Sequence, residues 1–151
     1  MLALTVMSVF TMGAAIPTKY CCSAVSPPIS WGEVPAGTRS IAVICDDPDA
    51  PGGDWVHWVL FNLPPDTLKL DEGVPRKDQL PNGAIQGMTD YGRVGYDGPC
   101  PPPGRPHRYF FKVYALDTKL DLDPSAEKAD VLKAMEGHIL AKGELMGKFG
   151  R

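Results

Sequence analysis

Two histidines, an aspartate and a tyrosine that could form one binding pocket lie in two separate stretches of the sequence. Asp47 opens an Asp-Pro-Asp-Ala-Pro run, and His57 follows it in a tryptophan-rich apolar segment. His107 and Tyr109 come directly after a loop dominated by proline and glycine. Histidines can donate hydrogen bonds to phosphate or carboxylate oxygens and gain charge as the ligand enters, and a tyrosine adds a neutral hydroxyl donor. The residue types predict a small polar site set into a hydrophobic wall.

Asp47 needs a different role, because a bare carboxylate repels an anion. We expect it to accept a hydrogen bond from a histidine, or from the amine of a zwitterionic head group, and so to fix the orientation of its partner. Trp55 can serve either as a wall of the pocket or as ordinary core. A proline-rich loop is stiff and loses little entropy on binding, so it suits a pocket wall.

Three apolar runs are expected to be the strands that position these side chains. Residues 40–45 and 55–63 are apolar on both faces, which is typical of strands covered on both sides, and the first of them should be central. Residues 107–116 form the third run, where period two puts the histidine and the tyrosine on one face. In the second run the same period puts His57 on a face with Phe61. The long loop between the second and third runs is expected to carry function.

The C-terminal part predicts one helix followed by a strand. Asp123 is suited to cap a helix whose first turn contains Pro124, and apolar residues follow at helical spacing to an end near Gly137. Beyond it, residues 141–149 alternate between apolar and polar, which predicts an edge strand with one wet face. The sequence thus predicts one mainly β domain over residues 1–151.

Some neighbouring residues have structural interpretations only. We expect Asp49 to brace its turn, Arg108 to form an ion pair on the far face of its strand, and His138 to be a hydrogen-bonded core residue. Trp31 and Trp58 are expected to lie in the core.

Composition excludes several classes of partner. The chain carries 15 basic and 18 acidic residues, a formal net charge of -3, with no basic stripe for nucleic acid. It has neither a polybasic run nor an apolar segment long enough for stable membrane insertion. With 44% hydrophobic residues, 16 glycines and 16 prolines, it predicts a folded domain rich in turns.

We expect a binding protein rather than an enzyme. The sequence contains no His-Glu-x-x-His or Gly-x-Ser-x-Gly pattern and no obvious nucleophile beside a base. Two histidines and Asp47 do have the ligand types of a zinc or iron site, so a metal-dependent hydrolase stays as an alternative. The prediction is no catalytic residue, no bound metal and no cofactor.

The four cysteines and the N-terminus leave alternatives open. Cysteines 21, 22, 45 and 100 can all be free thiols, or at most one of the adjacent Cys21 and Cys22 can bridge to Cys100 or Cys45. Residues 1–17 are apolar, but the first basic residue comes only after them and polar residues interrupt the run, so a first strand is favoured over an export signal. A cytoplasmic location is therefore expected.

The two signature stretches resemble those of a known family. Residues 47–51 with His57 and Trp58, and residues 98–102 with His107-Arg108-Tyr109, resemble the phosphatidylethanolamine-binding protein family, also called Raf-kinase-inhibitor-like proteins. The resemblance to its compact bacterial and archaeal branch covers nearly the whole chain. It implies two antiparallel sheets in Greek-key order and one or two short helices, including one near the C-terminus.

The resemblance also implies a small anion-binding pocket between the two signature loops. The expected ligand is a phosphorylated or phospholipid head-group-like molecule, with a regulatory role through partner proteins. The family name adds kinase or protease inhibition as an alternative, and an exposed apolar face would make a homodimer reasonable. Carried over to this sequence, the pocket residues are Asp47, Trp55, His57, Gly98, Pro101, Pro102, His107 and Tyr109.

Overall fold

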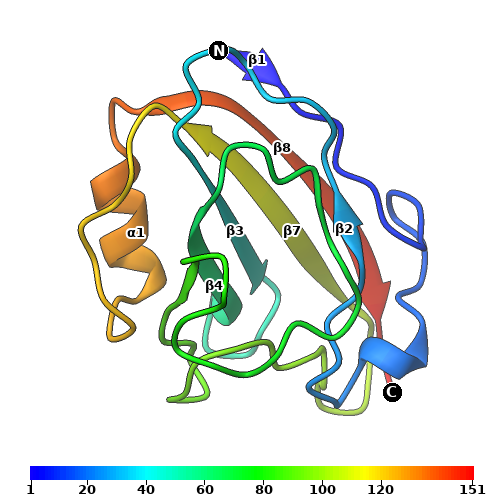
Figure 1. Ribbon diagram of the computed structural model, residues 1–151. Coiled ribbons are helices and arrows are strands. Elements are labelled where there is room, and N and C mark those ends of the chain that lie inside the picture. Colours follow the sequence, from blue (N-terminus) through cyan, green and yellow to red (C-terminus); the bar gives the residue numbers. More distant parts are fainter.

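The computed structural model describes residues 1–151 and shows a mixed six-stranded sheet, a small two-stranded sheet and one α-helix (Figure 1). The large sheet has the strand order β1-β8-β7-β3-β4-β6, and the small sheet pairs β2 with β5. The predicted mainly β fold is confirmed, with the departure that β1 runs parallel to β8. In chain order the elements are β1 (Leu2–Ala3), the 3-10 helix η1 (Thr18–Tyr20), β2 (Ile29–Ser30), β3 (Ser40–Asp47), β4 (Trp55–Leu63), β5 (Lys69–Leu70), β6 (Ile85–Gln86), β7 (His107–Leu116), α1 (Lys128–Met135) and β8 (Ile139–Phe149).

The strand β3 occupies the centre of the large sheet. It pairs antiparallel with β4 on one side and β7 on the other, and all eight of its residues are buried. The central position predicted for this run is confirmed, and β4 and β7 begin and end where the sequence predicts them. β3 continues two residues beyond the apolar run, to Asp46 and Asp47. Because successive side chains of a strand point to opposite faces, the last two residues of β3 place one carboxylate on each face of the sheet.

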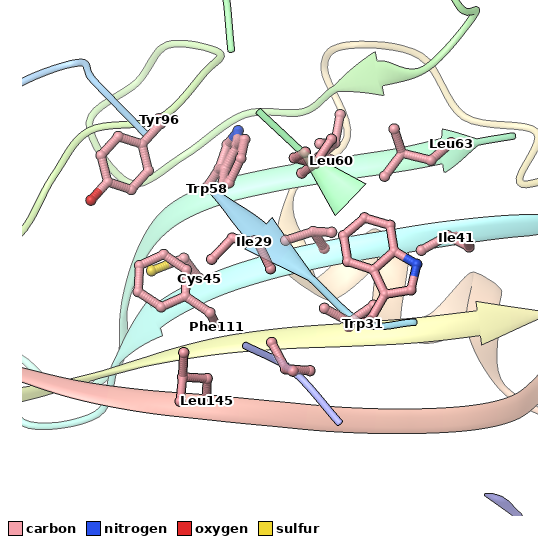
Figure 2. Close-up of a cluster of buried hydrophobic side chains, with 14 of the residues drawn as sticks. Ile29, Trp31, Ile41, Cys45, Trp58, Leu60, Leu63, Tyr96, Phe111 and Leu145 are labelled. Atoms are coloured by element: carbon pink, nitrogen blue, oxygen red, sulfur yellow. The ribbon is translucent and has the colours of Figure 1, made fainter. Parts of the chain in front are cut away.

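Two hydrophobic clusters cover the two faces of the large sheet. The larger one lies between the sheet and the N-terminal part of the chain, and Figure 2 shows Ile29 of β2 and Trp31, which directly follows β2, over the sheet residues. The smaller one lies under α1, whose Val131 is fully buried against the sheet. Trp31 and Trp58 are 2% and 0% exposed, which confirms the core position predicted for both. Burial on both faces explains why the middle parts of β3 and β4 are apolar on both faces.

Two irregularities in β4 change which side chains share a face. Cys45 pairs with Trp58 but Asp46 pairs with Val56, so His57 is an extra residue without a partner on β3, as in a β-bulge. The bulge turns His57 toward the larger cluster, while Phe61 belongs to the smaller one. The prediction that His57 and Phe61 share a face is therefore wrong, because strict period two does not survive a bulge.

The helix α1 starts later than the sequence predicts. Asp123 accepts a hydrogen bond from the backbone N–H of Ser125 at 2.8 Å, so it forms a local turn instead of a helix cap. The helix begins at Lys128 after Glu127, whose backbone N–H donates to Asp130 Oδ2 at 2.9 Å. Its last residue is Met135, and Gly137 has a φ of 77°, in agreement with the end predicted near this glycine.

The N-terminal segment is part of the folded domain. Leu4, Val6, Phe10 and Ile16 all lie in the larger cluster, and β1 extends the sheet beside β8. The apolar character that also suited an export signal is explained by this burial. The helices of the structure are all too short to cross a bilayer.

Asn62 should contribute measurably to stability, because it performs two functions at the second irregularity of β4. Its φ is 59°, a left-handed conformation, and its side-chain amide both donates to the carbonyl oxygen and accepts from the N–H of Leu120, at 2.9 and 2.8 Å. We expect Asn62→Ala to lower the free energy of unfolding by about 2 kcal/mol, since both bonds are lost. Asn62→Gly should cost less, because glycine adopts positive φ freely. Urea unfolding measures both, and equal losses would show that the backbone conformation is unimportant.

Candidate functional site

Three strands bring the predicted site residues to one end of the large sheet. β3 ends at Asp47, β4 begins two residues before His57, and β7 begins at His107. Because β4 and β7 both run antiparallel to β3, their starts lie beside its end. The bulge in β4 adds His57 to the face that Tyr109 occupies, and the two rings meet edge to face with centroids 5.3 Å apart.

A cavity of about 540 Å³ opens at this end of the sheet. Four of the residues predicted from the sequence line it, namely Trp55, His57, Pro102 and Tyr109. The remaining walls come from residues 50–52 of the first signature loop and from Asp54, Asp90, Tyr91 and Cys100.

Asp47 and His107 lie directly behind the cavity wall and form a buried pair. They are 3% and 9% exposed, and His107 Nδ1 lies 2.7 Å from Asp47 Oδ2. The His107 ring stacks on the ring of Tyr109, with an interplanar angle of 18°. The other oxygen of Asp47 accepts the backbone N–H of Asp49 at 2.7 Å. This geometry suits the orienting role expected for Asp47, because the carboxylate fixes the histidine ring that supports Tyr109.

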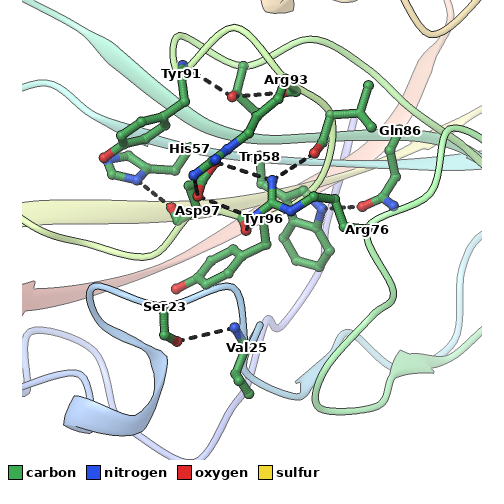
Figure 3. A network of polar contacts seen from close by, with 12 residues as sticks. Ser23, Val25, His57, Trp58, Arg76, Gln86, Tyr91, Arg93, Tyr96 and Asp97 are labelled. Atoms are coloured by element: carbon green, nitrogen blue, oxygen red, sulfur yellow. Dashed lines mark hydrogen bonds and ion pairs between the residues drawn. The ribbon is translucent and has the colours of Figure 1, made fainter.

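His57 is held in one orientation by the backbone. Its Nδ1 donates to the carbonyl oxygen of Asp97 at 2.6 Å, so the other ring nitrogen is left for the cavity (Figure 3). Burial lowers the pKa of His57 below 6.5, and the bond to the carbonyl only partly opposes this effect. The ring is therefore neutral at pH 7 and presents Nε2 as an acceptor. The sequence-based expectation that this histidine gains charge as the ligand enters therefore requires proton uptake on binding.

The mouth of the cavity is aromatic and acidic. Trp55 and Tyr91 are 38% and 39% exposed, and their rings meet edge to face with centroids 5.5 Å apart. The cavity walls include the carboxylates of Asp54 and Asp90 but no lysine or arginine. Aromatic faces next to carboxylates attract an ammonium group. The arrangement can therefore accommodate a cation at the mouth and a hydrogen-bonding, partly anionic group deeper in, at His57 and Tyr109.

Gly98 and Pro101 lie outside the cavity walls and hold the loop in place. The backbone N–H of Gly98 donates to the carbonyl oxygen of Ser23 at 2.8 Å. A Cβ at this glycine would lie 2.0 Å from the carbonyl oxygen of Tyr20, so only glycine permits the close approach. The carbonyl oxygen of Pro101 accepts a hydrogen bond from Arg151 Nε at 2.7 Å. These contacts fix the wall that Pro102 presents.

An ion-pair network behind His57 was not predicted from the sequence. Asp97 is 7% exposed, and its carboxylate accepts hydrogen bonds from both Arg76 and Arg93 (Figure 3). Arg76 also donates to the carbonyl oxygens of Val94 and Tyr96. The two arginines therefore fix the backbone segment whose carbonyl orients His57.

Arg108 and His138 were expected to have structural roles only. Arg108 donates to both carboxylate oxygens of Asp49 at 2.9 Å and holds the pKa of Asp49 at about 2, so the predicted ion pair is confirmed. His138 is not a core residue. Its side chain is 46% exposed, and its Nδ1 lies 2.7 Å from Asp117 Oδ1. It occupies the turn between α1 and β8, which places it at the surface.

Sequence reasoning missed Tyr91, Asp54 and Asp90 of the cavity. Tyr91 and Asp90 lie in the long loop, where the available signal was a Thr-Asp-Tyr-Gly cluster within a segment expected to carry function. Asp54 directly precedes β4, and its carboxylate accepts a hydrogen bond from Lys128 Nζ at 2.6 Å. The helix α1 therefore ties down one side of the mouth. No group of three or more His, Cys, Asp and Glu side chains is arranged to hold a metal ion.

The low pKa of His57 leads to an expected pH dependence of stability. The unfolded chain binds this proton near pH 6.5 whereas the folded protein binds it only at lower pH. Below about pH 6.5 the unfolded state therefore binds more protons than the folded state. As the pH is lowered through this range, the free energy of unfolding falls by up to about 1.4 kcal/mol per pH unit. Above that pH, His57 is neutral in both states and the free energy of unfolding no longer depends on its titration. Urea unfolding at pH 7.5 and 5.5 should show a smaller pH effect for His57→Gln than for the parent, and equal effects would contradict the assignment.

Comparisons with known proteins agree on one family. The model of the phosphatidylethanolamine-binding protein family matches residues 6–150. A UPF0098 protein of Methanothermobacter thermautotrophicus is 56% identical over 138 residues, which cover 90% of this chain and 91% of that protein. The UPF0098 protein YbhB of Escherichia coli is 45% identical over 128 residues, which cover 83% of this chain and 81% of that protein.

Solved structures give the same result. A phosphatidylethanolamine-binding protein homolog from Chlamydia trachomatis superposes with a TM-score of 0.89 at 39% identity, covering 100% of this chain and 99% of that one. YbcL of Escherichia coli, described as a member of the mammalian family of the same name, has a TM-score of 0.90 at 35% identity and covers 98% of both chains. The likeness extends over the whole domain, including the strands that carry the cavity.

Proposed function

Because this chain belongs to the phosphatidylethanolamine-binding protein family, we propose that its cavity binds a small zwitterionic ligand with a phosphate and an ammonium group. One observation carries the proposal. The ends of three strands bring His57 and Tyr109, backed by the Asp47–His107 pair, to a cavity of about 540 Å³. Pockets of this size with a few convergent polar groups are typical small-molecule sites.

The chemistry of the walls supports one orientation of the ligand. The phosphate lies at the inner end, where Tyr109 donates its hydroxyl and His57 Nε2 faces a phosphate oxygen. Both Nε2 and the fully ionised phosphate are acceptors, so one proton must lie between them in the complex. The ammonium group lies at the mouth, over Trp55 and Tyr91 and near Asp90. A molecule with a phosphate alone would place no cation against the aromatic rings of the mouth and the nearby carboxylate of Asp90.

The cavity supports binding rather than catalysis. Its walls contain no serine, threonine or lysine, and the sulfur of Cys100 is engaged in a disulfide. Burial raises the pKa values of Tyr91 and Tyr109, which makes both poor nucleophiles at neutral pH. The cavity walls therefore contain no side-chain nucleophile that an adjacent base activates.

Calorimetric titration with phosphoethanolamine, inorganic phosphate and ethanolamine tests the proposal. We expect phosphoethanolamine to bind more tightly than either fragment, because only it fills both ends of the cavity. As pH rises above about 6.5, its affinity should fall by up to about tenfold per pH unit, since one proton is retained in the complex. His57→Gln should weaken binding and flatten this dependence.

His138→Gln is the matched control, because this histidine is exposed and is absent from the cavity walls. It should leave affinity and pH dependence unchanged. Equal effects of both variants, or equal affinity for phosphoethanolamine and phosphate, would contradict the proposed orientation.

A further inference from the structure

The disulfide between Cys22 and Cys100 joins two segments that are distant in the sequence. The bridge spans 78 residues and links the chain just after η1 to the second signature loop. Both half-cystines are exposed, in contrast to the buried thiols of Cys21 and Cys45. An exposed disulfide can be attacked by thiols from solution.

A second cavity gives access to this disulfide. Its volume is about 470 Å³, and both half-cystines, Arg76 and Arg93 line it. The carboxylate of Asp97 balances one of the two guanidinium charges, so the cavity keeps a net positive charge. Cys100 also lines the ligand cavity, so this residue lies between the ligand cavity and the second cavity. A positive surrounding favours both an approaching anionic thiol and the thiolate that leaves.

We propose that this second cavity is a site of thiol–disulfide exchange with an anionic low-molecular-weight thiol, and that the exchange weakens ligand binding next door. The second half of this inference rests on the proposed function. In the first step the external thiolate bonds to the sulfur of one half-cystine. The bond between Cys22 and Cys100 breaks, and the other sulfur leaves as a thiolate that takes a proton from water.

A second external thiolate then completes the reaction. It attacks the external sulfur of the mixed disulfide and releases the second protein thiolate. The protein ends with two thiols, and the two external thiols end as one disulfide, so electrons balance without any other reactant.

The chain's own thiols are unsuited to this exchange. Burial raises the pKa of Cys21 to about 12, and burial also raises the pKa of Cys45 well above its ordinary value. Neither carries an appreciable thiolate fraction at neutral pH, and the thiolate is the reactive form. Exchange therefore requires a thiol from outside.

The disulfide is the last of three links between the loop wall and the N-terminal segment. The backbone N–H of Gly98 donates to Ser23, and the N–H of Cys22 donates to the carbonyl oxygen of Pro99 at 2.9 Å. Beyond Pro99 only the disulfide ties the loop to the N-terminal segment before Pro102 reaches the ligand cavity. Cys22 is held at a φ of 49°, a conformation that it can leave once the bridge opens. Opening therefore loosens a wall of the ligand site.

Reaction with reduced glutathione tests the exchange itself. In samples quenched with acid before the second step is complete, we expect one glutathionyl group on Cys22 or Cys100 by peptide mass spectrometry and none on Cys21 or Cys45. Arg93→Gln should slow the reaction with glutathione severalfold and the reaction with 2-mercaptoethanol less, because glutathione carries a further negative charge besides its thiolate. No reaction under native conditions, or equal slowing of both thiols, would overturn the assignment of the cavity.

The effect on the ligand site is measured in the oxidised protein, the reduced protein and the double variant Cys22→Ser/Cys100→Ser. The affinity for phosphoethanolamine should be about tenfold lower in the reduced protein and in the double variant than in the oxidised protein. Amide hydrogen exchange at Cys22 should rise in parallel, and this readout needs no ligand. Equal affinity in all three states overturns the coupling. If the oxidised protein binds no phosphoethanolamine, the proposed function fails, while the glutathione and hydrogen-exchange results still decide the exchange.

Discussion

Replacing Gly98 with alanine is expected to destabilise the protein by about 3 kcal/mol or more. The new Cβ would lie 2.0 Å from the carbonyl oxygen of Tyr20 and 3.1 Å from that of Ser23. Both atoms belong to the backbone, so neither can move away by a change of rotamer. The signature loop or the N-terminal segment must shift, and the hydrogen bond from Gly98 to Ser23 is lost with it. Urea or thermal unfolding measures the loss.

Gly52→Ala is the matched control for this substitution. Gly52 lies in the other signature loop, and no atom lies within 4 Å of the Cβ position. We expect a change within about 0.5 kcal/mol, as for an ordinary surface substitution. Similar stabilities of both variants would mean that Gly98 is not needed for the close approach and that its place in the motif has another cause.

Loss of the disulfide is expected to have an even larger effect on stability. The bridge closes a loop with a sequence separation of 78, and cross-linking a loop of this length removes about 4 kcal/mol of unfolded-state entropy. The double variant Cys22→Ser/Cys100→Ser should lose about this much free energy of unfolding relative to the oxidised protein. Denaturant unfolding of the parent in the presence and absence of a reductant measures the same quantity without substitution.

The reductant provides an internal control. It should lower the stability of the parent but leave that of the double variant unchanged, because the variant has no bridge to open. A parent that is equally stable in both states would show that the bridge does not constrain the unfolded chain.

β3 and β4 could be predicted from the sequence because both of their faces are buried, and β7 because its alternate residues are buried. β4 and β7 have the predicted bounds, since runs of apolar residues flanked by proline and glycine have few other solutions in a small domain. The late start of α1 could not be predicted. Asp123 suits a helix cap and a local turn equally well, and only the contacts of Glu127 and Asp130 decide between them.

The pairing in the disulfide was left open for a similar reason. Adjacent Cys21 and Cys22 are equivalent in sequence terms, and the fold decides between them by burying Cys21 and exposing Cys22 near Cys100. Such a bridge is typical of an oxidising compartment, so it does not support the cytoplasmic location expected from the N-terminus.

The candidate site could be predicted in part. Residues at strand ends, such as His57 and Tyr109, were accessible to sequence reasoning because the antiparallel order gathers strand ends. The contribution of the long loop was not accessible. Tyr91 reaches the cavity from a segment without regular structure, and Asp97 acts through its backbone carbonyl. A β-bulge, which no residue type signals, determines the face of His57.

A crystal structure of the oxidised protein with phosphoethanolamine tests the central claim most directly. The account predicts the phosphate within hydrogen-bond distance of His57 Nε2 and the Tyr109 hydroxyl, with the ammonium group over Trp55 and Tyr91. Phosphoethanolamine bound with its phosphate at the mouth, or held elsewhere while this cavity contains only water, would contradict it.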